Sequence, residues 1–248
     1  MTRKKALTVY LTGAFGQILM VSAAVFILRR CGVTVGYTTP AGLAAIAVGG
    51  VSSAVWGTIA AVKYKKIRPV KVLKDFINVK QKPQHYLLAL SLLLLDFLYV
   101  LFGGRCPLAS WYQPIVLFFT ALIFGGIEEI GWRYLFQPML QEKHGYILST
   151  LCTFAAWGVW HWLFFYIDGS LPGIVIPAFY MGLLTNCFIL STVYNVTGSL
   201  WLCAMTHSLI NVFSQLVQGG SGAVSWICRA LIFAAAVLFS MKTRKTKS

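Results

Sequence analysis

Long apolar stretches separated by short polar connections run through the whole chain. Apolar stretches of about 20 residues are long enough to cross a bilayer as helices. The first follows a basic cluster, Thr2-Arg-Lys-Lys5, as in a signal peptide. It is too long for that and has no clear cleavage site, so we expect an uncleaved span. We predict eight spans, at about residues 6–28, 41–62, 86–102, 114–135, 146–167, 174–194, 200–217 and 223–241.

The composition agrees with a membrane protein. Of the 248 residues, 58% are hydrophobic and 11% charged, and the mean hydropathy is +0.75. A soluble domain would carry roughly 25% charged residues. No repeat, low-complexity tract or soluble domain interrupts the spans. We therefore predict an all-α polytopic membrane helical bundle that forms a single domain over residues 1–248. Its motif-bearing core lies at about 114–217.

The basic residues are concentrated in connections on one side of the predicted bundle. With eight spans, the N-terminal cluster, the long connection after span two, Lys143 and the C-terminal tail fall on one side. Only Arg29, Arg30 and Arg105 fall on the other. Because cytoplasmic loops carry an excess of Lys and Arg, we predict cytoplasmic N- and C-termini and loops that touch anionic lipid headgroups. This placement of the net charge of +15 between apolar spans argues against a nucleic-acid partner.

Cysteines and one isolated acid leave alternatives open. The six cysteines show no metal-ligand spacing such as CxxC, and most lie within apolar spans, where they are expected to be small buried hydrophobes. Cys31 and Cys106 fall in predicted external loops and could pair. Asp96, in the third span, is open to a structural hydrogen-bonding role or to a part in the functional site.

The segment Phe124-Gly-Gly-Ile-Glu-Glu-Ile-Gly-Trp-Arg133 holds two of the chain's six acidic residues side by side. An ionisable group at the bilayer centre costs about 2.5–3.5 kcal/mol, so such groups usually face a partner or a wet cavity. Glu129 and Arg133 are four residues apart and share a helix face, whereas Glu128 points about 100° away from Glu129. We expect a structural ion pair between Glu129 and Arg133, which leaves Glu128 free for chemistry.

Three further polar residues stand out inside the spans: His161, His207 and Asn211. At 1.5 Å per residue, Glu128 and the two histidines lie about 15–22 Å from the cytoplasmic end of their spans, which favours a shared cavity. A carboxylate and an imidazole can hold and deprotonate a water molecule. A second imidazole and an amide can donate hydrogen bonds to the oxyanion formed when that water attacks a carbonyl. Each residue alone is more often an interhelical hydrogen-bonding group; together they predict peptide-bond hydrolysis within the membrane.

Three segments carry a family pattern. They are Glu128-Glu-Ile-Gly-Trp-Arg133, Trp157-Gly-Val-Trp-His161 and His207-Ser-Leu-Ile-Asn211. Together they resemble the motifs EExxxR, FxxxH and HxxxN/D of the CPBP (CAAX protease and bacteriocin-processing, Abi) family of intramembrane proteases. This family contains type II CAAX prenyl endopeptidases and bacterial bacteriocin-processing or immunity proteins. Only Trp157, in place of Phe, departs from the pattern, and the resemblance covers roughly residues 124–217.

The resemblance implies a role for each matching residue. Glu128 and His161 would activate water, His207 and Asn211 would form the oxyanion site, and Glu129, Arg133 and Trp157 would support them. The better-understood members of the family look like glutamate-dependent proteases without a metal. The chain also lacks HExxH, and its two histidines and a glutamate from distant spans could bind zinc only by tertiary convergence. We therefore expect no cofactor, with zinc as the alternative.

The hypothesis is an intramembrane glutamate-dependent endopeptidase that cuts a membrane-associated protein or peptide near the cytoplasmic half of the bilayer. A non-catalytic scaffold or immunity factor is one alternative. A proton-coupled transporter that uses Glu128, Asp96 and the histidines is another, but we see neither the broken helices nor the paired repeats that would favour it. The short loops resemble those of bacterial proteins, which suggests a bacterial plasma membrane and bacteriocin, pheromone or membrane-protein substrates. The sequence specifies neither the substrate nor an oligomeric state.

Overall fold

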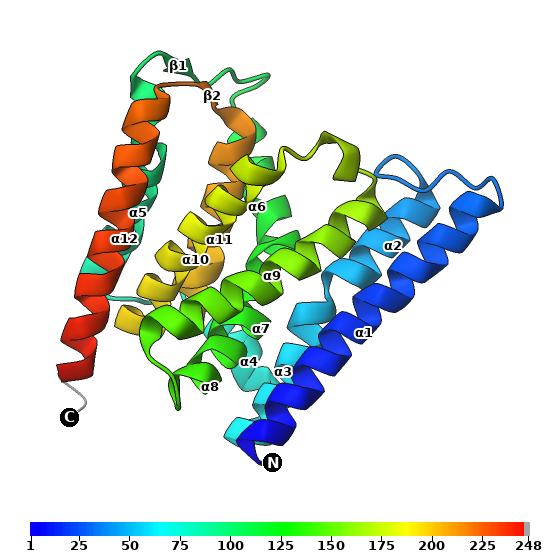
Figure 1. The fold of residues 1–248 in the computed structure, drawn as a ribbon, viewed down its shortest axis with the longest axis horizontal. Coiled ribbons are helices and arrows are strands. Elements are labelled where there is room, and N and C mark those ends of the chain that lie inside the picture. Colours follow the sequence, from blue (N-terminus) through cyan, green and yellow to red (C-terminus); the bar gives the residue numbers. More distant parts are fainter. Residues whose placement is uncertain (246–248) are drawn as a thin grey trace.

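The computed structural model describes residues 1–245, with side chains up to Ser240, and shows a bundle of helices (Figure 1). The basic tail at 242–247 lies beyond the described side chains. The helices are α1 (Arg3–Arg30), α2 (Pro40–Gly50), α3 (Ser52–Lys65), α4 (Pro69–Phe76), α5 (Pro83–Phe97), α6 (Gln113–Phe124), α7 (Glu129–Gly131), α8 (Gln137–Gln141), α9 (Tyr146–Asp168), α10 (Ile176–Thr197), α11 (Leu200–Leu216) and α12 (Gly222–Lys245). Two short antiparallel strands, β1 (Gly104–Arg105) and β2 (Gln218–Gly219), join neighbouring loops.

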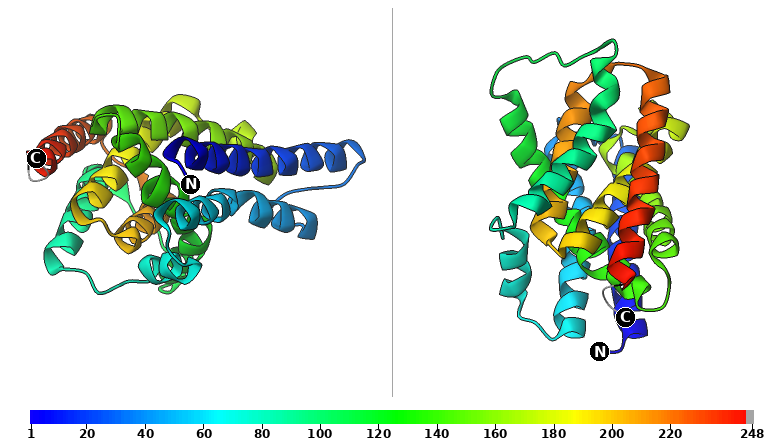
Figure 2. Two further views of the ribbon diagram at one scale, coloured as in Figure 1. Left: turned by 90° about the horizontal axis from the view of Figure 1, so that it is seen from below. Right: turned by 90° about the vertical axis from the view of Figure 1, so that its left-hand side faces the viewer.

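Within the described part of the chain, seven helical stretches are long and apolar enough to cross a membrane: Arg3–Arg30, Pro40–Lys65, Pro83–Leu101, Gln113–Gln141, Tyr146–Asp168, Ile176–Thr197 and Gly222–Ser240. This confirms the all-α, multi-pass architecture. The predicted span missing from these seven is the seventh in chain order, α11, which has only 17 residues and packs against α5, α6 and α10 inside the bundle. Counting α11 gives an even number of passes. Accordingly, the start of α1 and the end of α12 lie at the same end of the bundle (Figures 1 and 2).

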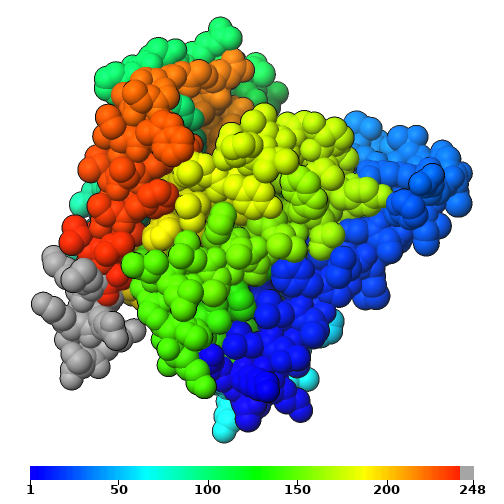
Figure 3. Space-filling model, viewed as in Figure 1, coloured from blue at the N-terminus to red at the C-terminus, as the bar shows by residue number. Residues whose placement is uncertain are grey.

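The outer surface is apolar where a bilayer would contact it. Soluble monomers rarely expose large apolar patches, because contact with water makes them prone to associate. Here α1 and α12 lie on the outside of the molecule (Figure 3) and, with α5, expose large hydrophobic side chains. These include Leu19, Met20, Phe26, Ile27, Leu87, Leu94, Trp226, Ile227, Leu231 and Leu238. The protein is therefore an integral multi-pass membrane protein.

The fourth predicted span is interrupted in its middle. After α6 come a 3₁₀ turn (Gly126–Glu128), the single turn of α7 and a π-helical turn (Trp132–Phe136). The expectation that no helix is broken was wrong here. The glycines allow the break because they let the chain approach α11 closely: a Cβ on Gly126 would lie 3.0 Å from Ser208 Oγ and 3.1 Å from Ala204 O. Irregular turns of this kind are frequent at functional sites.

The Gly- and Ala-rich second span also breaks, at Val51 between α2 and α3, and it packs closely against the interrupted span, as its small residues predict. The contact between α3 and α7 is made backbone to backbone. A Cβ on Gly57 would lie 2.6 Å from Gly131 Cα and 2.8 Å from Gly131 N. Since neither atom can move cheaply, α3 fixes the position of the segment that carries Glu128.

Gly57→Ala is therefore expected to lower the thermal unfolding temperature of the purified protein, because overpacking of this kind costs about 1–3 kcal/mol. The matched control is Gly16→Ala on α1, where no atom lies within 4 Å of an added Cβ. Equal unfolding temperatures for the two variants would show that the α3–α7 contact does not hold the bundle together.

Candidate active site

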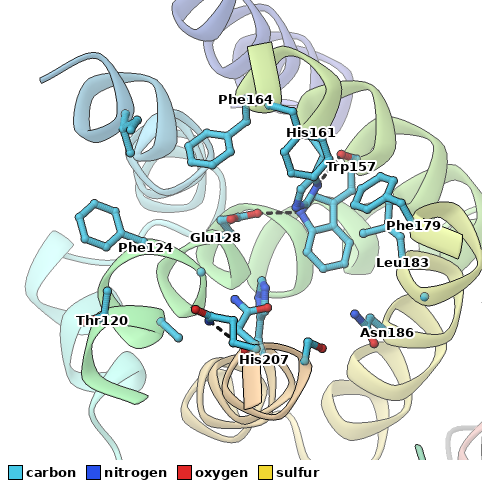
Figure 4. Close-up of a pocket in the computed structure, with 18 of the residues that line it drawn as sticks. Thr120, Phe124, Glu128, Trp157, His161, Phe164, Phe179, Leu183, Asn186 and His207 are labelled. Carbon is cyan, nitrogen blue, oxygen red and sulfur yellow. Dashed lines mark hydrogen bonds between the residues drawn. The ribbon is translucent and has the colours of Figure 1, made fainter. Parts of the chain in front are cut away.

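All four predicted catalytic residues line one cavity of about 770 Å³ (Figure 4). Helices α6, α9, α10 and α11 form its walls, and α2 with the α1–α2 connection completes them. The remaining lining is mostly apolar and aromatic. The lining includes Glu128, Trp157, His161, His207 and Asn211, together with Thr120, Phe124, Phe164, Phe165, Phe179, Ser214 and Gln215.

Glu128 is buried, with 5% of its surface exposed, and forms no salt bridge with any described residue. Its Oε2 accepts a hydrogen bond of 2.6 Å from the indole Nε1 of Trp157. Its backbone carbonyl accepts a bond of 3.2 Å from Ser53 Oγ, which is itself 2.9 Å from the hydroxyl of Tyr10. Helices α1 and α3 therefore hold the backbone of Glu128, and α9 holds its side chain.

Glu129 forms the ion pair that the spacing predicts. Arg133 Nη1 lies 3.3 Å from Glu129 Oε1, and both side chains are fully buried. The same oxygen lies 2.8 Å from His207 Nδ1, a contact that sequence reasoning missed. The Arg133 guanidinium also lies over the Trp157 ring, at 4.4 Å from its centroid. Glu129 therefore joins the first motif to the third, and the adjacent Glu128 has no such cation.

One hydrogen bond of His161 determines which of its two ring nitrogens can act as a base. Nδ1 lies 2.9 Å from the backbone carbonyl of Trp157. A carbonyl oxygen only accepts, so we assign the proton of the neutral imidazole to Nδ1. Nε2 then keeps its lone pair and can accept a proton. This is the tautomer that a general base requires.

His207 and Asn211 converge above the backbone of Gly125. A Cβ built on Gly125 would lie 2.5 Å from Asn211 Nδ2 and 3.3 Å from His207 Nε2. An imidazolium donates from both ring nitrogens, so in that form His207 contacts Glu129 through Nδ1 and can still donate from Nε2. Two nitrogens that can donate therefore meet at one point, as an oxyanion site requires. Only the missing side chain of Gly125 leaves that point open.

Trp157 contributes more than a wall to the cavity. Its ring lies 5.0 Å from that of His161 and 5.2 Å from that of His207, and it donates to Glu128 (Figure 4). The phenylalanine of the family pattern has no N–H to donate. The substitution of Trp for Phe within the second motif was the sequence signal for this bond, but the sequence alone does not say which group accepts it.

Trp157→Phe is expected to lower kcat/KM about tenfold, which corresponds to the loss of about 1.4 kcal/mol from one hydrogen bond to a charged group. The control is Trp160→Phe, which removes a comparable buried bond, from Nε1 to Ser52 Oγ (2.9 Å), outside the cavity lining. That variant should lose stability while kcat/KM stays close to wild type. If the two variants had equal activity, the Trp157–Glu128 bond would have no role in the reaction.

The remaining polar candidates lie elsewhere. Asp96 does not line the cavity; the charged group that acts on it is Arg229 of α12. This favours the structural role over participation in the site. Cys31 and Cys106 are both free and exposed, and their loops lie at opposite corners of one end of the bundle (Figure 1).

The side chains present do not form a metal site. Within the described residues, no group of three His, Cys, Asp or Glu side chains is arranged to hold a metal ion. His207 Nδ1 contacts Glu129, and His161 Nδ1 contacts a backbone carbonyl. Each histidine therefore has only Nε2 available as a metal ligand. We therefore derive no step through a metal, and the metal-free expectation stays a prediction.

A comparison with protein families agrees with this geometry. The profile described as type II CAAX prenyl endopeptidase Rce1-like matches residues 110–213, the segment that carries all three motifs. Over this segment the multi-pass membrane protein is similar to the CAAX-protease type. The match confirms the resemblance to the CPBP family over this part of the chain. No curated protein matches the sequence.

Proposed function

We propose that the protein is an intramembrane glutamate-dependent endopeptidase, in which Glu128 and His161 activate water and His207 with Asn211 bind the oxyanion. The observation that carries the proposal is the cavity around Glu128. This carboxylate forms no salt bridge with a described residue, and it shares the cavity with an imidazole whose Nε2 is available. The family match supports the protease class, and the cavity geometry supports the roles of the site residues.

The proposed reaction consumes one water molecule. Glu128, aided by His161, takes a proton from the water, and the resulting hydroxide oxygen attacks the carbonyl carbon of the scissile peptide bond. The carbonyl oxygen becomes an oxyanion that accepts hydrogen bonds from His207 Nε2 and Asn211 Nδ2. When the intermediate collapses, the C–N bond breaks and the proton passes from the base to the leaving nitrogen. The products are a carboxylic acid and an amine.

The test is cleavage of a library of apolar peptides by the purified protein in liposomes, with the products identified by mass spectrometry. The wild type should release discrete fragments, and His161→Ala should release almost none. Full cleavage by His161→Ala and by Glu128→Ala would refute the proposal.

Pre-treatment of the purified protein with a metal chelator is expected to leave this cleavage rate unchanged, because the mechanism uses only side chains. Metal-dependent hydrolases lose their activity when a chelator removes the ion. Loss of activity on chelation, with recovery on addition of zinc, would contradict the metal-free mechanism. The same chelator acting on a zinc protease provides the control.

One observation favours a second candidate, a proton-coupled transporter. Broken helices near the bilayer midplane are typical of transporters, and α6 is interrupted at Gly125 beside buried acids. Against it, every residue at 128–137 is buried, which closes the path on one side of the site. Proton-dependent solute flux in proteoliposomes, lost in Glu128→Gln, would favour the transporter.

The cellular location of the proposed enzyme follows from the likeness of its short loops to those of bacterial proteins and from the distribution of its basic residues. We assign it to a bacterial plasma membrane, where the basic connection between α3 and α5 contacts anionic headgroups. Lys71 and Lys74 on α4 are exposed and suited to this contact. Its substrate would be a peptide or membrane protein.

A further inference from the structure

Among the described residues, the exposed lining of the catalytic cavity lies toward one end of the bundle, called the open end, and the other end, called the closed end, is covered by buried residues. On the interrupted span, Thr120 and Phe124 are exposed and line the cavity, whereas every residue at 128–137 is buried. On α11, Ser214 and Gln215 line the cavity and are exposed, whereas all residues at 202–208 are buried. On α10, Ala178 is exposed and lines the cavity, and residues 187–193 are all buried. All three helices therefore have their open part toward the same end.

That end is opposite to the chain termini. The open parts are the start of α6, the start of α10 and the end of α11, which lie beside the β1–β2 pair and the connection before α10 (Figures 1 and 2). The start of α1 and the end of α12 lie at the closed end. A cavity that opens at this end does not combine cytoplasmic termini with cleavage near the cytoplasmic half of the bilayer, so the two sequence-based expectations do not fit together.

The distribution of basic residues decides between them. Twelve basic residues with described side chains lie outside the bundle interior at the closed end. They are Arg3, Lys4, Lys5, Lys63, Lys65, Lys66, Arg68, Lys71, Lys74, Lys80, Lys82 and Lys143. Only Arg29, Arg30 and Arg105 lie at the open end. Arg29 is moreover engaged with the backbone carbonyls of Tyr166, Ile167 and Val35. Such a bias places the closed end in the cytoplasm.

We propose that the catalytic cavity opens to the extracytoplasmic side and takes peptide segments presented from that face, namely the outer part of a membrane-anchored or exported peptide. The substrate half of this inference rests on the proposed protease function. The cavity is lined by Phe124, Phe164, Phe165 and Phe179, so the substrate residues that flank the scissile bond are large and apolar. A protein confined to the cytosol cannot reach this site.

Orientation is tested without catalysis by cysteine labelling. Cys31 and Cys106 are natural reporters, since both are exposed and lie at the open end. After mild reduction, a membrane-impermeant maleimide should label them in intact cells. In the variant Cys31→Ser/Cys106→Ser, a Lys80→Cys substitution provides the closed-end reporter, which should be labelled only after permeabilisation. The opposite labelling pattern would overturn the proposal.

The substrate is tested by presenting one apolar peptide from either face of the membrane on a single-span anchor. Cleavage of the extracytoplasmic version alone, lost in Glu128→Gln, is expected. Cleavage of the cytoplasmic version alone would overturn the inference. If neither version of the peptide were cleaved while the cysteine labelling was as expected, the proposed proteolytic function and its substrate would be overturned. The proposed orientation in the membrane would still stand.

Discussion

Glu128→Gln is expected to lower kcat/KM for peptide cleavage by about a thousandfold, within the range of 10²–10⁴ that general-base catalysis contributes. The amide oxygen can still accept the Trp157 N–H, so the side chain keeps its position while losing its ability to take a proton. The variant should therefore bind peptide with nearly unchanged affinity. Initial rates and equilibrium binding of a slowly cleaved peptide separate the two effects.

Glu142→Gln is the matched control, because Glu142 is exposed and accepts from Tyr64 far from the cavity. It should cleave like the wild type. Comparable cleavage rates for Glu128→Gln and Glu142→Gln would show that Glu128 takes no part in the reaction. If Glu128→Gln also kept the cellular phenotype, the non-catalytic scaffold or immunity factor would become the better interpretation.

Gly125→Ala is expected to lower kcat by about 10²–10³, the usual effect of losing one oxyanion-site donor. The added methyl would occupy the point where Asn211 Nδ2 and His207 Nε2 meet. Gly125 has φ −106°, a value open to any residue, so backbone strain does not account for the loss. Steady-state kinetics should show the effect in kcat more than in KM.

Two comparisons separate this effect from misfolding. Gly16→Ala adds the same methyl to α1 in open space and should leave kcat unchanged. The double variant Gly125→Ala/Asn211→Ala should be little slower than Asn211→Ala alone, because both substitutions disable the same site. Full additivity of the two effects would contradict a shared oxyanion site at Gly125.

The sequence predicted the architecture and the convergence of the site because each rests on a local pattern. Apolar length predicted the spans, and the spacing of Glu129 and Arg133 predicted their ion pair. The depth of Glu128, His161 and His207 along their spans predicted a shared cavity, and all three line it.

The features that sequence reasoning missed depend on contacts between distant segments. The break at Gly125 follows from close packing against α11, and the Trp157–Glu128 bond joins residues 29 apart. The Glu129–His207 contact spans 78 residues. Burial at 128–137 closes one end of the cavity only because several helices cover it together. No local pattern encodes such contacts.

An ordered solvent molecule beside Glu128 is the most direct test of the account. A high-resolution experimental structure of the protein in lipid should show a water within about 2.6–3.2 Å of both a Glu128 carboxylate oxygen and His161 Nε2. Such a water, absent in Glu128→Ala, is the predicted result. A hydrocarbon side chain packed between the two groups, or a separation too long for one water to bridge, would contradict it.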